Sequence, residues 1–175
     1  MLLSKDALRD EVALVTGGGT GIGKVIARRF AEAGAKVVIA SRSMEHLEPA
    51  AKEIAAAVAG STVIPMQLDV RDPARVDAVL EDILKQLGRV DILVNNAAGN
   101  FVCPTDQLTP NGWATVINIV LNGTFYCSRA VGKHWLDWQI TAWKEGLAEG
   151  TVRAGELATI HPALRRRLNI RTWLE

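Results

Sequence analysis

Short apolar runs alternate with helical periodicities along the first part of the chain. The segments Val12–Val15, Lys36–Ala40, Val63–Met66 and Ile92–Val94 are short and mainly apolar, as strands are when helices cover both faces of a parallel sheet. Pro65 lies inside the third segment, and proline cannot donate a hydrogen bond to a neighbouring strand. The pattern therefore predicts four buried strands, with the third at an edge of the sheet.

Helical segments separate these strands and carry clear start and stop signals. Apolar residues recur at helical spacing over residues 22–33, and Gly34 follows them. Asp72-Pro73 predicts the start of a helix that ends at Leu87, ahead of Gly88. Strands that alternate with helices of this length are joined by right-handed crossovers. We therefore expect an α/β fold with a doubly wound parallel sheet.

The pattern changes toward the C-terminus. Residues 110–138 have helical periodicity, and we expect two helices that meet near Asn122-Gly123. Beyond Trp138 the chain has no β-branched run that would form a fifth strand. Residues 135–147 and 157–168 instead have the apolar spacing of two amphipathic helical pieces.

The composition narrows the class of protein. With 175 residues, 49% of them hydrophobic and 22% charged, the chain is long enough for one domain with a core and too short to expect two. A net charge of +1 gives no field that would attract nucleic acid or an anionic membrane. No apolar run has the length of a membrane span, and the start of the chain has the pattern of neither a signal nor a transit peptide. We therefore expect a cytoplasmic protein with no nucleic-acid and no membrane partner.

The cysteines, the histidines and an arginine run give no assigned site. Cys103 and Cys127 are too few for a disulfide framework, and we expect both to be reduced thiols in the core. His134 and His161 are too far apart in the sequence for a local metal site, so we assign none. The run 165–167 contains three arginines, which form either a nucleic-acid patch or, more commonly, a solvated helix face.

A glycine-rich turn follows the first predicted strand, with the sequence Thr-Gly-Gly-Gly-Thr-Gly-Ile-Gly. Gly17 permits a tight turn, Gly21 lets the backbone approach a pyrophosphate, and Gly23 lets the helix pack closely on the strand. Glycines also occur in ordinary loops, but the strand–turn–helix context favours a dinucleotide site. The cofactor contacts predicted in this turn are Gly17, Gly18, Gly19, Thr20, Gly21, Ile22 and Gly23.

The end of the second predicted strand indicates which cofactor binds. Proteins that prefer NAD place an acid there, which holds the ribose 2′-hydroxyl. This strand ends in Ala40-Ser41-Arg42, so no acid repels a 2′-phosphate and Arg42 is placed to pair with one. The alternative is that Arg42 is a solvated residue at the start of a helix. We expect NADP(H).

Two separated motifs resemble the short-chain dehydrogenase/reductase family. They are the T-G-x-x-x-G-x-G spacing of residues 16–23 and the Asn-Asn-Ala-Ala-Gly segment Asn95–Gly99. The segments Asn95–Pro104, Thr109–Trp113 and Val120–Thr124 are similar to the branch of the 2,4-dienoyl-CoA and trans-2-enoyl-CoA reductases. The resemblance covers about residues 8–137 and implies a partial Rossmann sheet of about four strands in the order 3-2-1-4, with a helical C-terminal tail.

The resemblance also implies roles for particular residues. Asp69 would contact the adenine amino group, and the other implied cofactor contacts are Val70, Asn96, Ala97 and Gly99. The implied substrate contacts are Asn100 at the thioester, Phe101 beside the acyl chain, and Arg71 and Thr109 at the CoA portion of an acyl-CoA. For the last three the alternatives are a core aromatic, a surface charge and a helix cap, respectively.

One departure from the family pattern supports the branch. Most short-chain reductases have a catalytic-site asparagine where this chain has Val120, and the dienoyl-CoA reductases share the apolar replacement. Asn100 is then the remaining amide donor at the substrate site.

The family's catalytic pair has no counterpart in this chain. The family uses a tyrosine as proton donor and a nearby lysine that lowers its pKa. Tyr126 is the only tyrosine, it lies within a predicted helix, and Ala130 stands four residues on; the nearest lysine is Lys133. The family usually also has a serine beyond the fifth strand, and no serine follows Ser128 in this chain. We therefore assign no catalytic residue.

These observations divide the chain into two predicted parts. Residues 1–137 are the NADP(H)-binding Rossmann half of a short-chain dehydrogenase/reductase, and residues 138–175 are an atypical helical tail. The abrupt loss of resemblance near Asp137 favours a frameshifted or spliced reading frame, with a genuine tail as the alternative. The leading hypothesis is an inactive NADP(H)-binding part of an oxidoreductase whose intact form reduces unsaturated acyl-CoA. The alternatives are a non-catalytic nucleotide-binding or interaction module and a truncated product without function.

A further expectation concerns assembly. Without a fifth strand, Ile92–Val94 lies at an edge of the sheet with unpaired backbone groups. We expect the chain to associate with itself through this edge.

Overall fold

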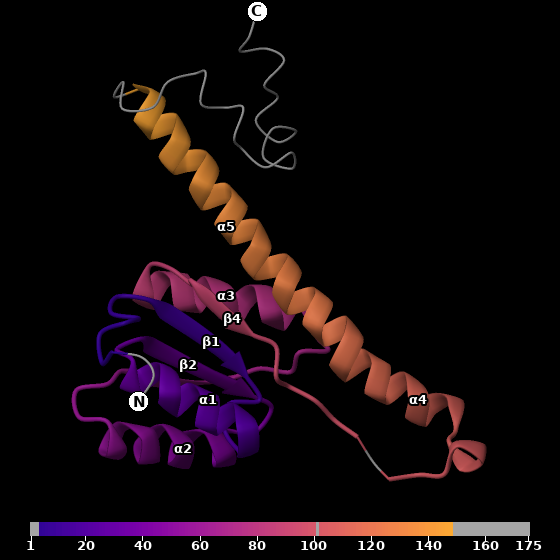
Figure 1. Ribbon diagram of the computed structural model, residues 1–175. Helices are drawn as coiled ribbons and strands as arrows, with labels where there is room; N and C mark the ends of the chain where they lie inside the picture. The colour runs from indigo at the N-terminus through magenta and orange to yellow at the C-terminus, as the bar shows by residue number, and fades with distance from the viewer. Residues whose placement is uncertain (1–3, 101, 149–175) are drawn as a thin grey trace, which may run out of the picture. The chain divides into compact units, whose positions relative to one another are not determined.

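The fold is given by a computed structural model that describes residues 4–100 and 102–148. It divides into two compact units between Val131 and Gly132. The first unit contains a four-stranded parallel sheet in the order β3-β2-β1-β4 (Figure 1). Its strands are β1 (Val12–Thr16), β2 (Lys36–Ser41), β3 (Val63–Gln67) and β4 (Ile92–Val94). The predicted α/β class and strand order are confirmed.

Three helices connect the strands, and the first and third begin and end near their predicted positions. They are α1 (Gly21–Glu32), α2 (Met44–Ala57) and α3 (Pro73–Leu87). Asp72 caps α3 by accepting hydrogen bonds from the backbone N–H groups of Ala74 and Arg75, at 3.0 and 3.1 Å. Gly88 ends the same helix with a φ of +80°, a conformation that glycine adopts without strain.

The register of the sheet brings the carboxyl ends of three strands together. Thr16 pairs with Ala40 across β1 and β2, and Val15 pairs with Val94 across β1 and β4. Because all four strands are parallel, the loops that follow them emerge at the same edge, which is where ligands bind in open α/β sheets.

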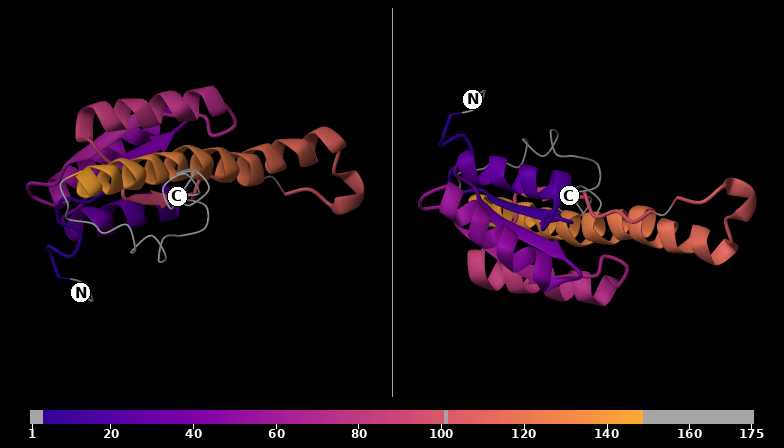
Figure 2. Two further views of the ribbon diagram at one scale, coloured as in Figure 1. Left: turned by 90° about the horizontal axis from the view of Figure 1, so that it is seen from above. Right: turned by 90° about the horizontal axis from the view of Figure 1, so that it is seen from below.

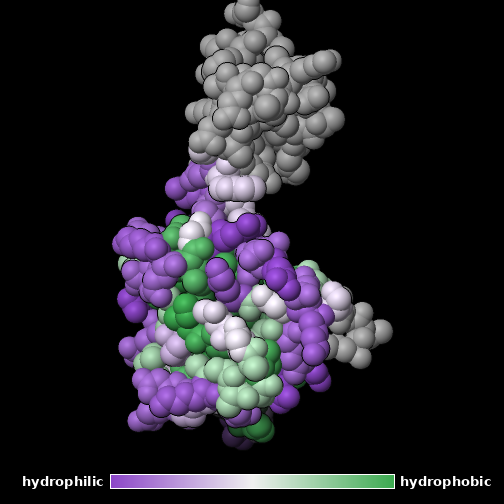
Figure 3. All heavy atoms as spheres, turned by 90° about the vertical axis from the view of Figure 1, so that its left-hand side faces the viewer, coloured by the Kyte–Doolittle hydropathy of each residue, from purple (hydrophilic) through white to green (hydrophobic). Residues whose placement is uncertain are grey.

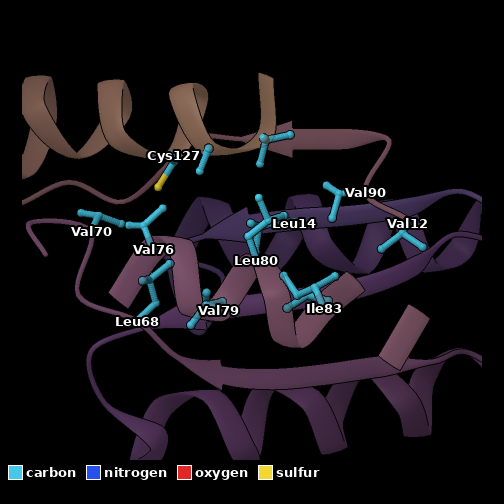
Figure 4. Close-up of a cluster of buried hydrophobic side chains, with 14 residues drawn as sticks. Val12, Leu14, Leu68, Val70, Val76, Val79, Leu80, Ile83, Val90 and Cys127 are labelled. Atoms are coloured by element: carbon cyan, nitrogen blue, oxygen red, sulfur yellow. The ribbon is translucent and has the colours of Figure 1, made fainter. Parts of the chain in front are cut away.

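Helices cover both faces of the sheet (Figure 2), and the two resulting cores use alternate residues of each strand. Val15 and Ile39 point toward α1 and α2, and both are fully buried. Leu14 and Val38 point to the other face, toward α3 and the start of α5 (Gly123–Ala148). Figure 4 shows this second cluster, with ten members labelled: Val12, Leu14, Leu68, Val70, Val76, Val79, Leu80, Ile83, Val90 and Cys127.

The helical region after the sheet begins with α4 (Pro110–Ile117), which follows a short 3₁₀ turn at Thr105–Gln107. One turn of π-helix, Asn118–Asn122, joins α4 to α5, so the two predicted helices do meet at Asn122-Gly123. A Cβ at Gly123 would lie 2.6 Å from Cγ2 of Val70, so the glycine lets α5 start close to the loop after β3.

Helix α5 continues without interruption to Ala148, so the helical piece expected over residues 135–147 forms the end of this helix and is not a separate element. No proline occurs between Trp138 and Ala148, so the backbone keeps its hydrogen bonds although the apolar stripe weakens. The second expected piece, residues 157–168, lies outside the described residues, and the division of the chain at 137 stays a prediction.

The two cysteines differ in environment. Both are free thiols, but only Cys127 is buried, whereas Cys103 is half-exposed. The prediction that both lie in the core is therefore wrong for Cys103, because it belongs to the irregular segment between β4 and α4.

None of the helices within residues 4–100 and 102–148 has both the length and the apolar composition needed to cross a membrane.

Candidate nucleotide-binding site

The glycine-rich turn connects the carboxyl end of β1 to the start of α1. Gly17 has a φ of +66° and donates its N–H to the carbonyl of Ala40 at 2.7 Å, which ties the turn to β2. Gly21 has a φ of +52°, and a Cβ there would meet no atom within 4 Å. The backbone at Gly21 therefore faces open space, as a turn that receives a pyrophosphate requires.

Gly23 is required by close packing. A Cβ at this position would lie 2.3 Å from the carbonyl oxygen of Gly17 and 2.5 Å from Nδ2 of Asn96. No side chain fits in that space, so the third glycine of the motif holds helix α1 against the end of the sheet. This is the packing role that the sequence motif predicts.

The N-terminus of α1 is open to an anion. Its cap residue, Thr20, makes no side-chain hydrogen bond to the helix, and its first turn has no acidic residue. Helix α3, in contrast, is capped by the carboxylate of Asp72. The first N–H groups of α1 and the positive end of its dipole are therefore available to a phosphate group.

Thr16 links the glycine turn to the end of β4. Its hydroxyl accepts the N–H groups of Asn96 and Ala97, both at 3.0 Å, and donates to the carbonyl of Val94 at 3.2 Å. The Asn96 amide in turn donates to the carbonyls of Thr16 and Gly17, at 3.0 and 3.3 Å. Thr16 is almost fully buried, and the sequence analysis assigned it no role. A buried threonine directly before a glycine turn is the signal that marks it.

A cavity of about 640 Å³ lies at this edge of the sheet. Eleven of the predicted cofactor residues line it: Gly17, Gly19, Thr20, Gly21, Ile22, Gly23, Arg42, Asp69, Val70, Asn96 and Ala97. Gly18 and Gly99 do not line it, because Gly18 packs on Ile39 and Gly99 packs on Ile119. The cavity also has lining residues that the sequence analysis missed: Ala40, Ser41, Ser43, His46, Leu68, Ala98 and Ile119.

Arg42 lies in a backbone segment that hydrogen bonds from Gln67 and Ser41 hold in place. The side-chain amide of Gln67 donates to the Arg42 carbonyl at 2.9 Å, and the guanidinium of Arg75 donates to the Gln67 carbonyl at 3.0 and 3.2 Å. Ser41 donates its hydroxyl to the carbonyl of Ser43 at 3.3 Å. These bonds fix the backbone that presents Arg42, while its side chain stays exposed.

Asp69 is paired with Arg71. The Arg71 guanidinium donates to both carboxylate oxygens of Asp69, at distances from 2.5 to 3.1 Å. These hydrogen bonds hold the pKa of Asp69 below its ordinary value, although partial burial acts in the opposite direction. The carboxylate is therefore charged at neutral pH, as an acceptor for an amino group must be.

Of the four predicted substrate residues, the structure describes Arg71, Asn100 and Thr109, and none of these three lines the cavity. Thr109 caps α4 by accepting the N–H of Gly112 at 3.1 Å, which agrees with its alternative assignment as a cap. Phe101 lies outside the described residues. The substrate roles of these four residues stay predictions.

Tyr126 is partly buried at the margin of a core cluster. Tyr126 packs against the α3-side cluster and makes an edge contact with Phe125, with ring centroids 5.8 Å apart. Val120, in the π-helical turn, is 43% exposed. Within the described part of the chain, no tyrosine or lysine lines the cavity.

A larger cavity of about 1260 Å³ lies at the opposite edge, where the strands begin. Four of its charged residues form two ion pairs, Arg9–Asp6 and Arg29–Glu32. Figure 3 shows this side, where hydrophilic side chains surround a narrower band of hydrophobic ones. The lining residues of this cavity include Gly34 and Gly60 but no glycine-rich turn from a strand into a helix and no helix N-terminus, so the nucleotide site belongs at the other edge. Residues 4–100 and 102–148 contain no group of three side chains that would hold a metal ion.

Comparison with known families gives a match over most of the chain. A family described as short chain dehydrogenase matches residues 11–142. A probable 2,4-dienoyl-CoA reductase of Bacillus subtilis is 45% identical over 130 residues, which are 74% of this chain and 50% of that protein. The peroxisomal 2,4-dienoyl-CoA reductase of Danio rerio is 44% identical over 134 residues, 77% of this chain and 44% of the relative. The chain thus spans about half the length of the curated relatives it matches.

Solved structures give the same result. A short chain dehydrogenase from Bacillus anthracis superposes with a TM-score of 0.71 and 50% identity, over 75% of this chain and 54% of that one. A metagenomic short-chain oxidoreductase in complex with NADP superposes with a TM-score of 0.69 and 32% identity, over 75% of this chain and 59% of that one.

Proposed function

Because this chain belongs to the short chain dehydrogenase family, we propose that it is the NADP(H)-binding part of an oxidoreductase whose intact form reduces unsaturated acyl-CoA. The observation that carries the proposal is the cavity at the carboxyl edge, where the glycine turn, the open N-terminus of α1 and Arg42 lie together. The relatives named 2,4-dienoyl-CoA reductases support the substrate class.

The residues present fit NADP(H). The open space beside Gly21 and the uncapped helix α1 suit a pyrophosphate, and the Asp69 carboxylate suits the adenine amino group. Arg42 at the end of β2 suits a 2′-phosphate, since no acid stands there. When bound, the cofactor supplies a hydride, and this chain's residues bind and orient it.

The test of the proposal is nucleotide binding. In titration calorimetry, the chain should bind NADPH more tightly than NADH, and Arg42→Ala should remove most of the difference. One charge-assisted contact contributes about 1.5–3 kcal/mol, which corresponds to a tenfold or larger shift in Kd. Equal affinities for the two cofactors, with no effect of Arg42→Ala, contradict the assignment of NADP(H).

A second candidate is a nucleotide-binding module without catalysis. The observation that favours it for this chain is that Tyr126, the only tyrosine, packs against the α3-side cluster and does not line the cavity. A missing general acid costs about two to four orders of magnitude in rate. NADPH oxidation with dienoyl- and enoyl-CoA substrates should therefore proceed at no useful rate. Turnover at an ordinary enzymatic rate that Tyr126→Phe abolishes would exclude the module and assign catalysis to Tyr126.

The compartment stays a prediction. We propose a cytoplasmic location, on the sequence grounds given above, although relatives of this chain include proteins named as peroxisomal.

A further inference from the structure

We propose that His46 is a second contact for the 2′-phosphate of NADP(H), beside Arg42, and so sets the preference for the phosphorylated cofactor. This inference rests on the proposed function. His46 lies in the first turn of α2, its side chain is exposed, and it lines the cavity at the carboxyl edge of the sheet together with Arg42.

The first turn of α2 packs directly on the glycine-rich turn. A Cβ at Gly19 would lie 3.2 Å from the carbonyl carbon and oxygen of His46 and 3.3 Å from its Cβ. The glycine therefore brings the backbone of His46 next to the turn that receives the cofactor. Ser41 and Ser43 line the same part of the cavity.

The charges around His46 favour an anion. Of the described residues that line the cavity, Arg42 and His46 are the basic ones and Asp69 is the acidic one. The carboxylate of Asp69 is engaged by the guanidinium of Arg71, which neutralises it. The cap residue of α2, Ser43, makes no side-chain cap hydrogen bond, so this helix start adds a positive dipole end to the two basic side chains. Glu45 is in the same turn but does not line the cavity.

An imidazole suits this position chemically. Its N–H donates to a phosphate oxygen in the neutral form, and protonation adds a positive charge. NAD(H) has a hydroxyl in place of the 2′-phosphate, so its binding gains little from this hydrogen bond or from the positive charge. His46 therefore acts on the difference between the two cofactors and not on dinucleotide affinity in general.

The experiment compares 2′,5′-ADP with 5′-AMP, which differ in the 2′-phosphate alone, by titration calorimetry on the full chain. His46→Ala should weaken 2′,5′-ADP about three- to tenfold, since an exposed charge-assisted hydrogen bond is lost, and leave 5′-AMP within about twofold. His46→Lys should restore binding of 2′,5′-ADP. Lys52→Ala is the matched control, because it removes a positive charge from the same helix without touching the cavity.

The outcomes separate this inference from the proposed function. An unchanged 2′,5′-ADP affinity in His46→Ala, or an equal loss for both ligands, overturns the role of His46 while Arg42 still selects the phosphate. Wild-type chain that binds neither ligand overturns both proposals. Circular dichroism checks that each variant is folded, and His46→Gln, with the same expected direction, replaces His46→Ala if that variant is not.

Discussion

At the scale of single residues, the site depends on closely packed atoms in and around the glycine-rich turn. The third glycine of the motif, Gly23, lies against the carbonyl of Gly17 and the amide of Asn96. The hydroxyl of Thr16 holds Asn96 and Ala97 in turn. We therefore expect a substitution at any of these positions to shift the glycine turn, because the contacts share atoms.

Gly23→Ala should both destabilise the fold and weaken nucleotide binding. The added Cβ would meet the Gly17 oxygen at 2.3 Å, so α1 or the turn must shift. Overpacking of this kind costs about 1–3 kcal/mol of unfolding free energy. Urea unfolding with NADPH titration measures both effects. Val25→Ala, at an exposed position of the same helix, is the control and should stay within about 0.5 kcal/mol. An unchanged Gly23→Ala protein would show that the turn is less tightly packed than described.

A second prediction concerns Asp91, which precedes β4. Its carboxylate accepts the N–H of Val12 at 2.8 Å and pairs with Arg89. Burial acts to raise the pKa of Asp91, but the hydrogen bonds from Arg89 and Val12 outweigh it and hold the pKa below its ordinary value. The nearby Glu11 has its pKa raised, first by burial and then by the Asp91 charge.

A lowered carboxyl pKa stabilises the fold above the ordinary carboxyl range, and the stabilisation is lost as pH falls through the folded pKa. Asp91→Asn should therefore cost about 1 kcal/mol at pH 7 and less at pH 3, after discounting for solvent exposure. Urea unfolding at the two pH values checks this, with Glu81→Gln, from an exposed pair with Lys85, as the control. An equal loss at both pH values would assign Asp91 a role that does not depend on its charge.

At the scale of elements, the helices differ in whether a side chain caps their N-terminus. Helix α3 is capped by Asp72, and α4 is capped by Thr109. The two helices that start at the cavity, α1 and α2, have cap residues whose side chains make no cap hydrogen bond. Capping thus stabilises the helices away from the cavity, and the two helices at the cavity keep their N-termini open to a phosphate.

This division predicts a difference between two cap substitutions. Asp72→Ala removes two hydrogen bonds to backbone N–H groups and should lower the unfolding free energy by about 1 kcal/mol. Ser43→Ala removes no cap bond and should change the stability of the nucleotide-free protein by less than about 0.5 kcal/mol. Thermal melting of both variants without nucleotide makes the comparison, and equal losses would show that Ser43 does cap α2 in solution.

At the scale of the whole molecule, the two edges of the sheet differ. Strand β3 has Pro65 in its middle, which lacks an N–H group, whereas β4 pairs with β1 on one side and has no proline. Unpaired N–H and C=O groups along an edge are a template for another strand.

We therefore predict self-association through β4. Size-exclusion chromatography with light scattering should show an average mass that rises with protein concentration. A monomer at every concentration, with a sharp melting transition that is lost on deletion of residues 139–175, would contradict this prediction and make the C-terminal residues an evolved part of the fold.

The sequence alone determined the four strands, the helices between them and the position of the glycine-rich turn. It also identified Arg42 as the residue that would select NADP(H). Apolar runs and helical periodicity depend on neighbours in the chain, so β1 to β4 and the start of α3 at Asp72-Pro73 follow from local rules. The strand order and the assignment of Asp69 followed from the family resemblance, because no local pattern specifies which strands become neighbours.

Only the tertiary structure decided which side chains meet at the cavity. Thr16 and Asn96 are 80 positions apart, yet share two hydrogen bonds, one from the backbone N–H of Asn96 to the Thr16 hydroxyl and one from the Asn96 amide to the Thr16 carbonyl. His46 reaches the glycine turn because α2 starts at the same sheet edge as α1. Parallel strands deliver distant segments to one edge, so contacts at that edge depend on packing across the sheet and cannot be obtained from spacing along the chain.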